Sequence, residues 1–233
     1  MHASLWVLLP LIALALLAFA AFVFLFYKVW SFSFQKMGIP RHLVIPALLA
    51  ILIGGLFNIP IWHNQSTTVA VNVGGAIIPL LISLYLLRKA PLLKTALAIA
   101  VVATVSGLLA EVGADTGIRL HYGYVILPLT AVSLALILAR RKAPQVAFIS
   151  GTIGGVVGVD LIHLKELIDL GVPHMSIGGR GVLDGICTTG IIAALLAGLL
   201  WRKKEVMAKR QSDRPHDPCD HLGLKGENGL RFW

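Results

Sequence analysis

The sequence predicts an all-α integral membrane protein, a polytopic bundle of about seven transmembrane helices. Of its 233 residues, 57% are hydrophobic and only 13% are charged, whereas soluble domains carry about 25% charged residues. The mean hydropathy is +0.84. Long apolar runs follow one another along the chain, and a backbone in lipid must satisfy its own hydrogen bonds, which favours helices.

The predicted helices are taken from these apolar runs, because a span needs about 20 residues to cross the hydrocarbon core. The first run has no basic segment before it and is longer than a typical signal-peptide core, so we predict that this helix is retained. We expect a transmembrane domain over 1–201 and a polar, disordered cytoplasmic tail over 202–233. In chain order, the predicted spans are 4–27, 43–62, 69–87, 95–110, 124–139, 145–163 and 183–201.

The positions of lysine and arginine predict the orientation. Nine of them follow the first, third and fifth spans, and eight lie in the tail, so 17 of the 20 basic residues fall on one side. Positively charged loops stay in the cytoplasm, so we predict an inner-membrane protein with its N-terminus outside and its C-terminus inside. The net charge of +9 then reflects orientation and contact with the lipid bilayer, and we expect no nucleic-acid partner.

The acidic residues gather at the opposite end of the predicted spans. Outside the tail there are six, and all fall on or near the predicted outer side: Glu111, Asp115, Asp160, Glu166, Asp169 and Asp184. Four histidines accompany them, namely His63, His121, His163 and His174. The sequence therefore places its ionisable chemistry at the outer face.

Two segments suggest an internal repeat. IGGLFNIPIWH (53–63) aligns without gaps to IGGVVGVDLIH (153–163), and a second Gly-Gly pair follows each, in VGGAIIP (73–79) and IGGRGVLD (177–184). Such a repeat would relate helices two and three to helices six and seven in a parallel sense, as in some transporter folds. The glycines beside Arg180 also suit a re-entrant turn or an anion-binding helix N-terminus.

Four motifs in order also suggest a family: FNIPI (57–61), NVGGAIIPLLISLYLL (72–87), SGTIGGVVGVDLIHL (150–164) and SIGGRGVLDGICTTGIIAALLA (176–197). Together they resemble an uncharacterised prokaryotic membrane family, domain of unknown function 1614, over most of 43–200. The resemblance implies acids at the positions of Asp160 and Asp184, but no activity. Its pattern has Asn at the position of His163, and GAD and GGAG where this chain has GVD and GGRG.

Asp160 is the principal candidate site residue, because a carboxylate in an apolar run needs a partner, a proton or a function. His163 lies three residues later, on the same face of a continuous helix, and Glu166 continues that stripe. Asp184 opens the last predicted helix. The alternative is structural: Asp160 would end its helix at the headgroup boundary, and Asp184 would cap free N–H groups.

Our leading functional hypothesis is binding or transport of an ion or small solute, by a protein that is not an enzyme. Asp160 and Asp184 would form the binding site with His163 and His63, and Asn58 and Asn72 would supply polar lining groups. A divalent cation is one candidate ligand, with Asp160, His163 and Glu166 as its ligands.

Two other functions are also compatible with the sequence. An intramembrane aspartyl protease would use Asp160 with Asp184 or Asp115, since two carboxylates sharing a proton activate water. A non-enzymatic membrane scaffold would use these acids only as helix caps and surface groups.

Overall fold

The computed structural model describes residues 3–64, 67–113, 117–120, 122–179 and 185–212. The chain divides into two compact units, Met1–Trp201 and Arg202–Trp233. The predicted tail begins at residue 202, the last helix runs to Ser212, and residues 213–233 lie outside the described residues. Apart from the end of this helix, all features below belong to the first unit.

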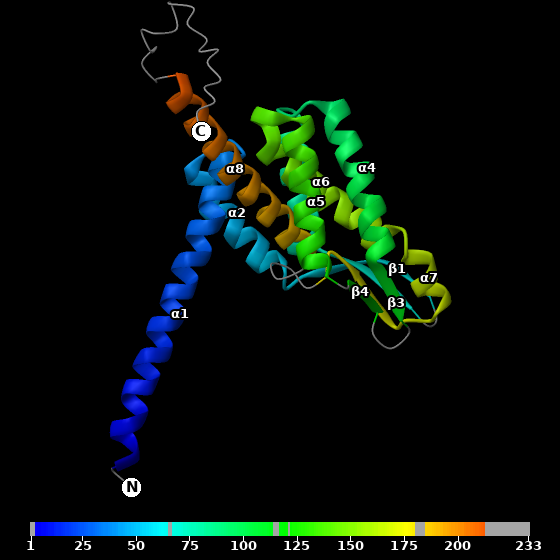
Figure 1. The fold of residues 1–233 in the computed structure, drawn as a ribbon. Coiled ribbons are helices and arrows are strands. Elements are labelled where there is room, and N and C mark those ends of the chain that lie inside the picture. The colour runs from blue at the N-terminus through cyan, green and yellow to red at the C-terminus, as the bar shows by residue number, and fades with distance from the viewer. Residues whose placement is uncertain (1–2, 65–66, 114–116, 121, 180–184, 213–233) are drawn as a thin grey trace, which may run out of the picture. The chain divides into compact units, whose positions relative to one another are not determined.

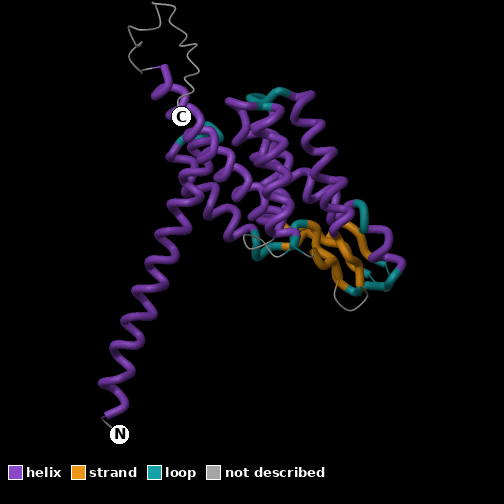
Figure 2. The backbone as a smooth tube through the Cα atoms, viewed as in Figure 1, coloured by secondary structure: helices purple, strands orange, loops and turns teal. Residues whose placement is uncertain are grey.

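Helices make up most of the described chain (Figures 1 and 2). Three helices are long and apolar enough to cross a membrane, and four shorter apolar helices accompany them, which confirms the predicted helical bundle. The α-helices are α1 (Ala3–Lys36), α2 (Arg41–Gly54), α3 (Ile78–Leu87), α4 (Leu92–Leu109), α5 (Gly123–Leu138), α6 (Ala143–Gly155), α7 (Leu164–Asp169) and α8 (Gly185–Ser212). Two π-helices, η1 (Val73–Ile77) and η3 (Val156–Leu161), and a 3₁₀ turn, η2 (Arg140–Lys142), complete them.

Helix α6 is the centre of the bundle. Nearly all of its residues are buried, and it packs against α3, α4 and α5. A helix that is apolar on every side belongs inside a bundle, and the core residues Val146 and Phe148 lie on it. At its far end α6 continues directly into η3, so η3 is positioned by the best-packed helix of the fold.

Short strands join the helices at one end of the bundle, and the sequence did not predict them. Helix α2 ends at Gly54, so the span predicted over 43–62 is part helix and part strand. The span predicted over 69–87 likewise begins as a strand. An apolar run alone does not distinguish a buried strand from a helix. The strands are β1 (Asn58–His63), β2 (Thr68–Asn72), β3 (Ala110–Gly113), β4 (Gly117–Leu120) and β5 (His174–Ile177).

The strands form two small sheets. In the larger, β2 lies between β1, to which it is antiparallel, and β5, to which it is parallel. The parallel pairing matches Thr68 with His174 and Val71 with Ile177. Strands β3 and β4 form a separate antiparallel hairpin. The larger sheet thereby joins the segment before α3 to the segment before α8.

The two segments of the suggested repeat have different secondary structures. Residues 53–55 and 153–155 both lie at the end of a helix. Beyond that point the first segment becomes strand β1, whereas the second continues as the π-helix η3. The sequence alignment over 53–63 and 153–163 therefore does not extend to conformation.

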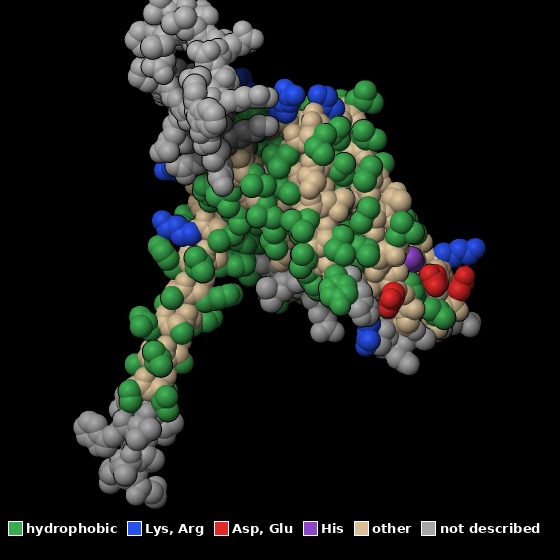
Figure 3. Space-filling model, in the orientation of Figure 1, with side chains coloured by type: hydrophobic (Ala, Val, Ile, Leu, Met, Phe, Trp, Pro, Cys, Tyr) green, Lys and Arg blue, Asp and Glu red, His purple; other side chains and the backbone are tan. Residues whose placement is uncertain are grey.

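The charges on the bundle separate as the sequence predicted. Arg88, at the end of α3, and the residues of η2 lie at the end away from the strands. The described acidic residues before residue 202 lie at the strand end, with Glu111 on β3 and Glu166 and Asp169 on α7. Figure 3 shows the acidic side chains gathered there, beside a few basic ones. The strand end is thus where acidic and histidine side chains meet.

Candidate functional site

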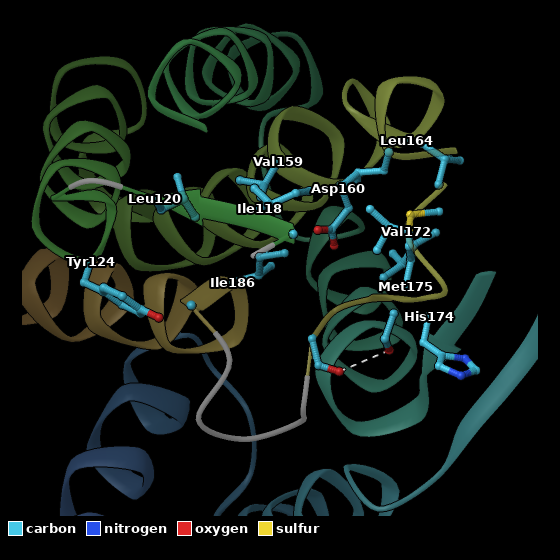
Figure 4. Close-up of a pocket in the computed structure, with 16 residues that line it drawn as sticks. Ile118, Leu120, Tyr124, Val159, Asp160, Leu164, Val172, His174, Met175 and Ile186 are labelled. Carbon is cyan, nitrogen blue, oxygen red and sulfur yellow. Dashed lines mark hydrogen bonds between the residues drawn. The ribbon is translucent and has the colours of Figure 1, made fainter. Parts of the chain in front are cut away.

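A pocket of about 260 Å³ opens at the strand end of the bundle. Its walls come from the β3–β4 hairpin, the start of α5, η3, α7, β5 and the start of α8. Most of the lining side chains are apolar, Tyr124, His174 and Ser176 add polar groups, and Asp160 is the only acid among the described residues that line it. Figure 4 shows the Asp160 carboxylate directed into this space, with Ile118, Val172 and Ile186 around it.

Asp160 is held by a backbone N–H from the segment after β5. Its Oδ2 accepts a hydrogen bond of 2.8 Å from Gly178 N–H, and its side chain is half-buried. Gly178 has a φ of +80°, and a methyl carbon there would come within 3 Å of Ala76 N and Gly75 C. Only glycine fits, and the Gly-Gly turn therefore presents its amide to an anion, the protein's own carboxylate.

A chain of polar contacts joins this turn to the first half of the protein. Asn72 is fully buried, and its Oδ1 accepts from Gly75 N–H at 2.7 Å. Its Nδ2 donates to Gly55 O at 2.9 Å and to Asn58 Oδ1 at 3.0 Å. Ser176 Oγ lies 2.9 Å from the same Asn58 oxygen and 3.1 Å from Gly179 O. Asn58 and Asn72 are thus brought together, but behind the pocket rather than in its lining.

His163 contacts Gly107 and Glu166 rather than Asp160. Its Nε2 lies 3.1 Å from Gly107 O at the end of α4, and its Nδ1 lies 3.3 Å from Glu166 Oε2. The prediction that Asp160 and His163 share a face assumed a continuous α-helix. The chain instead passes through the wider turns of η3 and restarts as α7 with His163 as its N-cap residue, which changes the side-chain phase.

The other predicted site residues are dispersed. His63 is exposed at the end of β1, where its Nδ1 contacts Thr68 Oγ1 at 2.8 Å. Among the described residues no three His, Cys, Asp or Glu side chains are grouped as metal ligands. The structure therefore does not gather Asp160, His163 and Glu166 around one ion. Asp184 and Asp115 lie outside the described residues.

Several lining residues escaped the sequence argument. Ile118 and Leu120 on β4, Tyr124 on α5, and Met175 and Ser176 on β5 all line the pocket. Except for Ser176, which begins the fourth quoted motif, these residues lie outside the motifs, and only the fold brings them together. The one usable signal was the IGGRG turn, whose first glycines, Gly178 and Gly179, both have positive φ.

Chemically, the arrangement is a carboxylate among apolar side chains. Aliphatic walls lower the local dielectric, so electrostatic interactions there are stronger than in water. A carboxylate accepts hydrogen bonds and carries a negative charge, and that of Asp160 accepts one from the Gly178 amide. The pocket therefore suits a small ligand that presents N–H donors or a positive charge to Asp160 and an apolar surface to the walls.

Comparison with known proteins places these residues in one family. The family described as "Protein of unknown function (DUF1614)" matches residues 53–196, which include Asn58, Asn72, Asp160 and Gly178. No curated protein matches the chain, and no solved structure matches it. The family match covers more than half of the 233 residues and agrees with the resemblance carried by the four motifs. The chain belongs to the DUF1614 family.

Proposed function

We propose that this protein binds a small, positively charged or N–H-bearing solute in the Asp160 pocket, and that binding is the recognition step of transport across the membrane. The observation that carries the proposal is the Asp160 carboxylate among the apolar lining residues of the pocket. An ionisable residue within an apolar bundle is a functional candidate by default, because its burial costs free energy.

The size of the pocket favours a small solute. Pockets for drug-sized ligands occupy about 300–1,000 Å³, and this one has about 260 Å³. The walls supply several aliphatic side chains, including Leu164 and Leu167 of α7. A compact organic cation would pack its apolar part against these aliphatic side chains and place its charge beside the Asp160 carboxylate. A dispersed set of His and Glu side chains favours such a cation over a tightly coordinated metal ion.

Interrupted helices favour transport over simple binding. The segment that enters the bundle before α3 begins as strand β2 and π-helix η1, and η3 ends the central helix. Transporter sites commonly lie where membrane helices are broken, and π-helices are frequent at functional sites. Gly178 packs directly on η1 and donates its N–H to Asp160 of η3, so both interruptions meet at Gly178, beside the pocket carboxylate.

The test is thermal unfolding of the detergent-purified full chain with metal cations, primary and quaternary amines, and amino acids. A ligand at one hundred times its Kd stabilises the folded state by about 2.7 kcal/mol. We expect at least one cationic compound to stabilise the wild type but not Asp160→Asn. Asparagine retains an acceptor for Gly178 N–H and removes only the charge.

The matched control is Asp169→Asn, because Asp169 is an exposed acid on α7 that does not line the pocket. This variant is expected to respond like the wild type. Equal stabilisation of Asp160→Asn would place the ligand elsewhere, and a panel without any stabilising cation would contradict the ligand class. If a compound binds but is not taken up by proteoliposomes, the transport part of the proposal is contradicted and the binding part stands.

We further propose that the strand end faces outward in the cytoplasmic membrane, with the N-terminus outside and the C-terminus in the cytoplasm. This orientation is supported by Arg88 and the basic residues of η2, which lie at the opposite end of the bundle. Basic loops of membrane proteins stay in the cytoplasm. In whole cells, a membrane-impermeant maleimide should label Arg119→Cys on β4 and spare Arg141→Cys. The reverse pattern would invert the orientation.

A further inference from the structure

Strand β1 exposes an apolar surface that nothing in the described chain covers. All six of its residues are exposed. The surface consists of Leu56, Phe57, Ile59, Ile61 and Trp62, which are between 42% and 80% exposed. We call these five residues the β1 apolar surface. Contiguous apolar patches on a sheet facing water are aggregation sites, so this surface requires a partner.

The β1 apolar surface continues the apolar side of α2. Leu49, Leu52 and Ile53, near the end of α2, are each about half exposed. The turn that follows is tight, with Leu56 N–H bonded to Ile53 O at 3.1 Å and Phe57 N–H to Gly54 O at 3.0 Å. Helix and strand therefore present adjoining parts of one apolar face.

Helix α2 is too short to cross a bilayer alone. Its 14 residues rise about 21 Å at 1.5 Å per residue, and the hydrocarbon core is about 30 Å thick. Helix α2 alone therefore leaves about 9 Å of the hydrocarbon core uncrossed. The chain that follows it, from Leu56 to Trp62, is apolar except for Asn58, so its side chains suit lipid beyond the end of the helix.

We propose that the β1 apolar surface is immersed in lipid at the headgroup–acyl boundary of the leaflet on the strand side. Helix α2 and strand β1 then form one composite span. Trp62 occupies the level where tryptophan is enriched in membrane proteins. The occupant of this surface is lipid acyl chain, and the proposal stands independently of any ligand in the Asp160 pocket.

The boundary position agrees with the chemistry of the strand edge. Among the described strands, β1 pairs only with β2, so its outer edge presents backbone groups, which the hydrocarbon centre does not tolerate. Pro60 removes one N–H donor from the strand, and the register shifts between Pro60 and Trp62. Near the headgroups, water reaches the remaining groups.

The test is a spin label at Ile61→Cys in the full chain, reconstituted in phosphatidylcholine–phosphatidylglycerol vesicles. Cys219→Ser is the background, since Cys187 is buried, and the same protein without Ile61→Cys reports background labelling. Collision rates are measured with oxygen, which concentrates in lipid, and with a water-soluble nickel chelate. Leu129→Cys, exposed in the middle of α5, and Arg119→Cys, exposed on β4, are the lipid and water controls.

The expected oxygen-to-nickel ratio at Ile61→Cys is several-fold above that at Arg119→Cys and below that at Leu129→Cys. A ratio equal to that of Arg119→Cys would overturn the proposal, because the surface would face water. Spectral broadening that disappears on dilution with unlabelled protein would also overturn it, because a second copy would then cover β1. Ile59→Cys, measured in the same way, guards against a local disturbance at one position.

Discussion

The segments 53–63 and 153–163 begin with the same three residues, Ile-Gly-Gly, and then adopt different secondary structures. The first leaves its helix and becomes the exposed strand β1. The second stays helical, widens into η3 and carries Asp160 to the pocket. The conformation after the shared glycines is therefore decided by the neighbours of each segment and not by its own first residues.

The neighbours differ in a simple way. Behind the first segment, Asn72 Nδ2 donates a hydrogen bond to the carbonyl of Gly55. Within that segment, Pro60 lacks the N–H that a continuing helix needs. Behind the second, α4 comes so close that Gly158 lies against Ala103 and Ser106. Ser106 Oγ also lies 3.1 Å from Gly154 O. The hydrogen bond from Asn72 to Gly55, which we call the polar clamp, lies where the first helix ends. Close packing against α4 accompanies the helix that continues.

Gly158→Ala should have the largest effect on this difference. A methyl carbon at this position would come within 3 Å of Ser106 Oγ and Ala103 O. The backbone of α4 cannot give way as a flexible side chain can, so we expect a loss of about 3 kcal/mol or more of unfolding free energy. Denaturant titration of the detergent-purified protein measures it.

Gly155→Ala, one turn earlier, is the matched control for Gly158→Ala. Its added carbon would meet only Ile186 side-chain atoms, at 3.3 Å and beyond. The helix-propensity gain of about 1 kcal/mol offsets this mild crowding, so its stability should stay within about 1 kcal/mol of wild type. Equal losses in both variants would show that α6, rather than the contact with α4, is sensitive at this point.

Asn72→Ala should have the next largest effect, on the first segment. It removes three hydrogen bonds from a fully buried side chain. The Gly75 N–H left behind is buried and Gly55 O is partly buried, and buried groups without a partner cost about 1–3 kcal/mol. We expect a loss of about 2–3 kcal/mol of unfolding free energy in the same titration.

Asn58→Ala separates the clamp from its outer partner. Asn58 is exposed, and without it Asn72 Nδ2 still donates to Gly55 O, so the expected loss is about 0.5 kcal/mol. Comparable losses in Asn58→Ala and Asn72→Ala would contradict a clamp centred on the buried asparagine. The pair therefore tests whether Gly55 O is the point at which helix α2 is stopped.

The sequence predicted the bundle well and the strand end poorly. The runs at 95–110 and 124–139 agree with α4 and α5 within three residues, because lipid exposure imposes a long apolar pattern. The strands were missed because the apolar run at 43–62 gives no sign that it changes from helix to strand, and because β5, one of the two partners of β2, lies more than a hundred residues away. Local patterns contain no information about such pairing.

The candidate site divides in the same way. Asp160 was identified because a lone carboxylate in an apolar run is conspicuous at any position along a helix. Its partner Gly178 and the pocket walls depend on tertiary packing. His163 was assigned to the same face as Asp160 by α-helical spacing, and η3 altered that spacing. The roles of Asn58 and Asn72 are also clear only from their contacts.

The parallel pairing of β2 with β5 has a consequence for the order of assembly. Thr68 and His174 are partners separated by 106 positions (174 − 68), so β2 is synthesised long before β5. Membrane segments through α6 must be inserted before the sheet can close, and distant contacts of this kind form slowly. The wall that holds Asp160 is therefore among the last parts to be completed, and a chain that stops before residue 178 would lack the amide that holds this carboxylate.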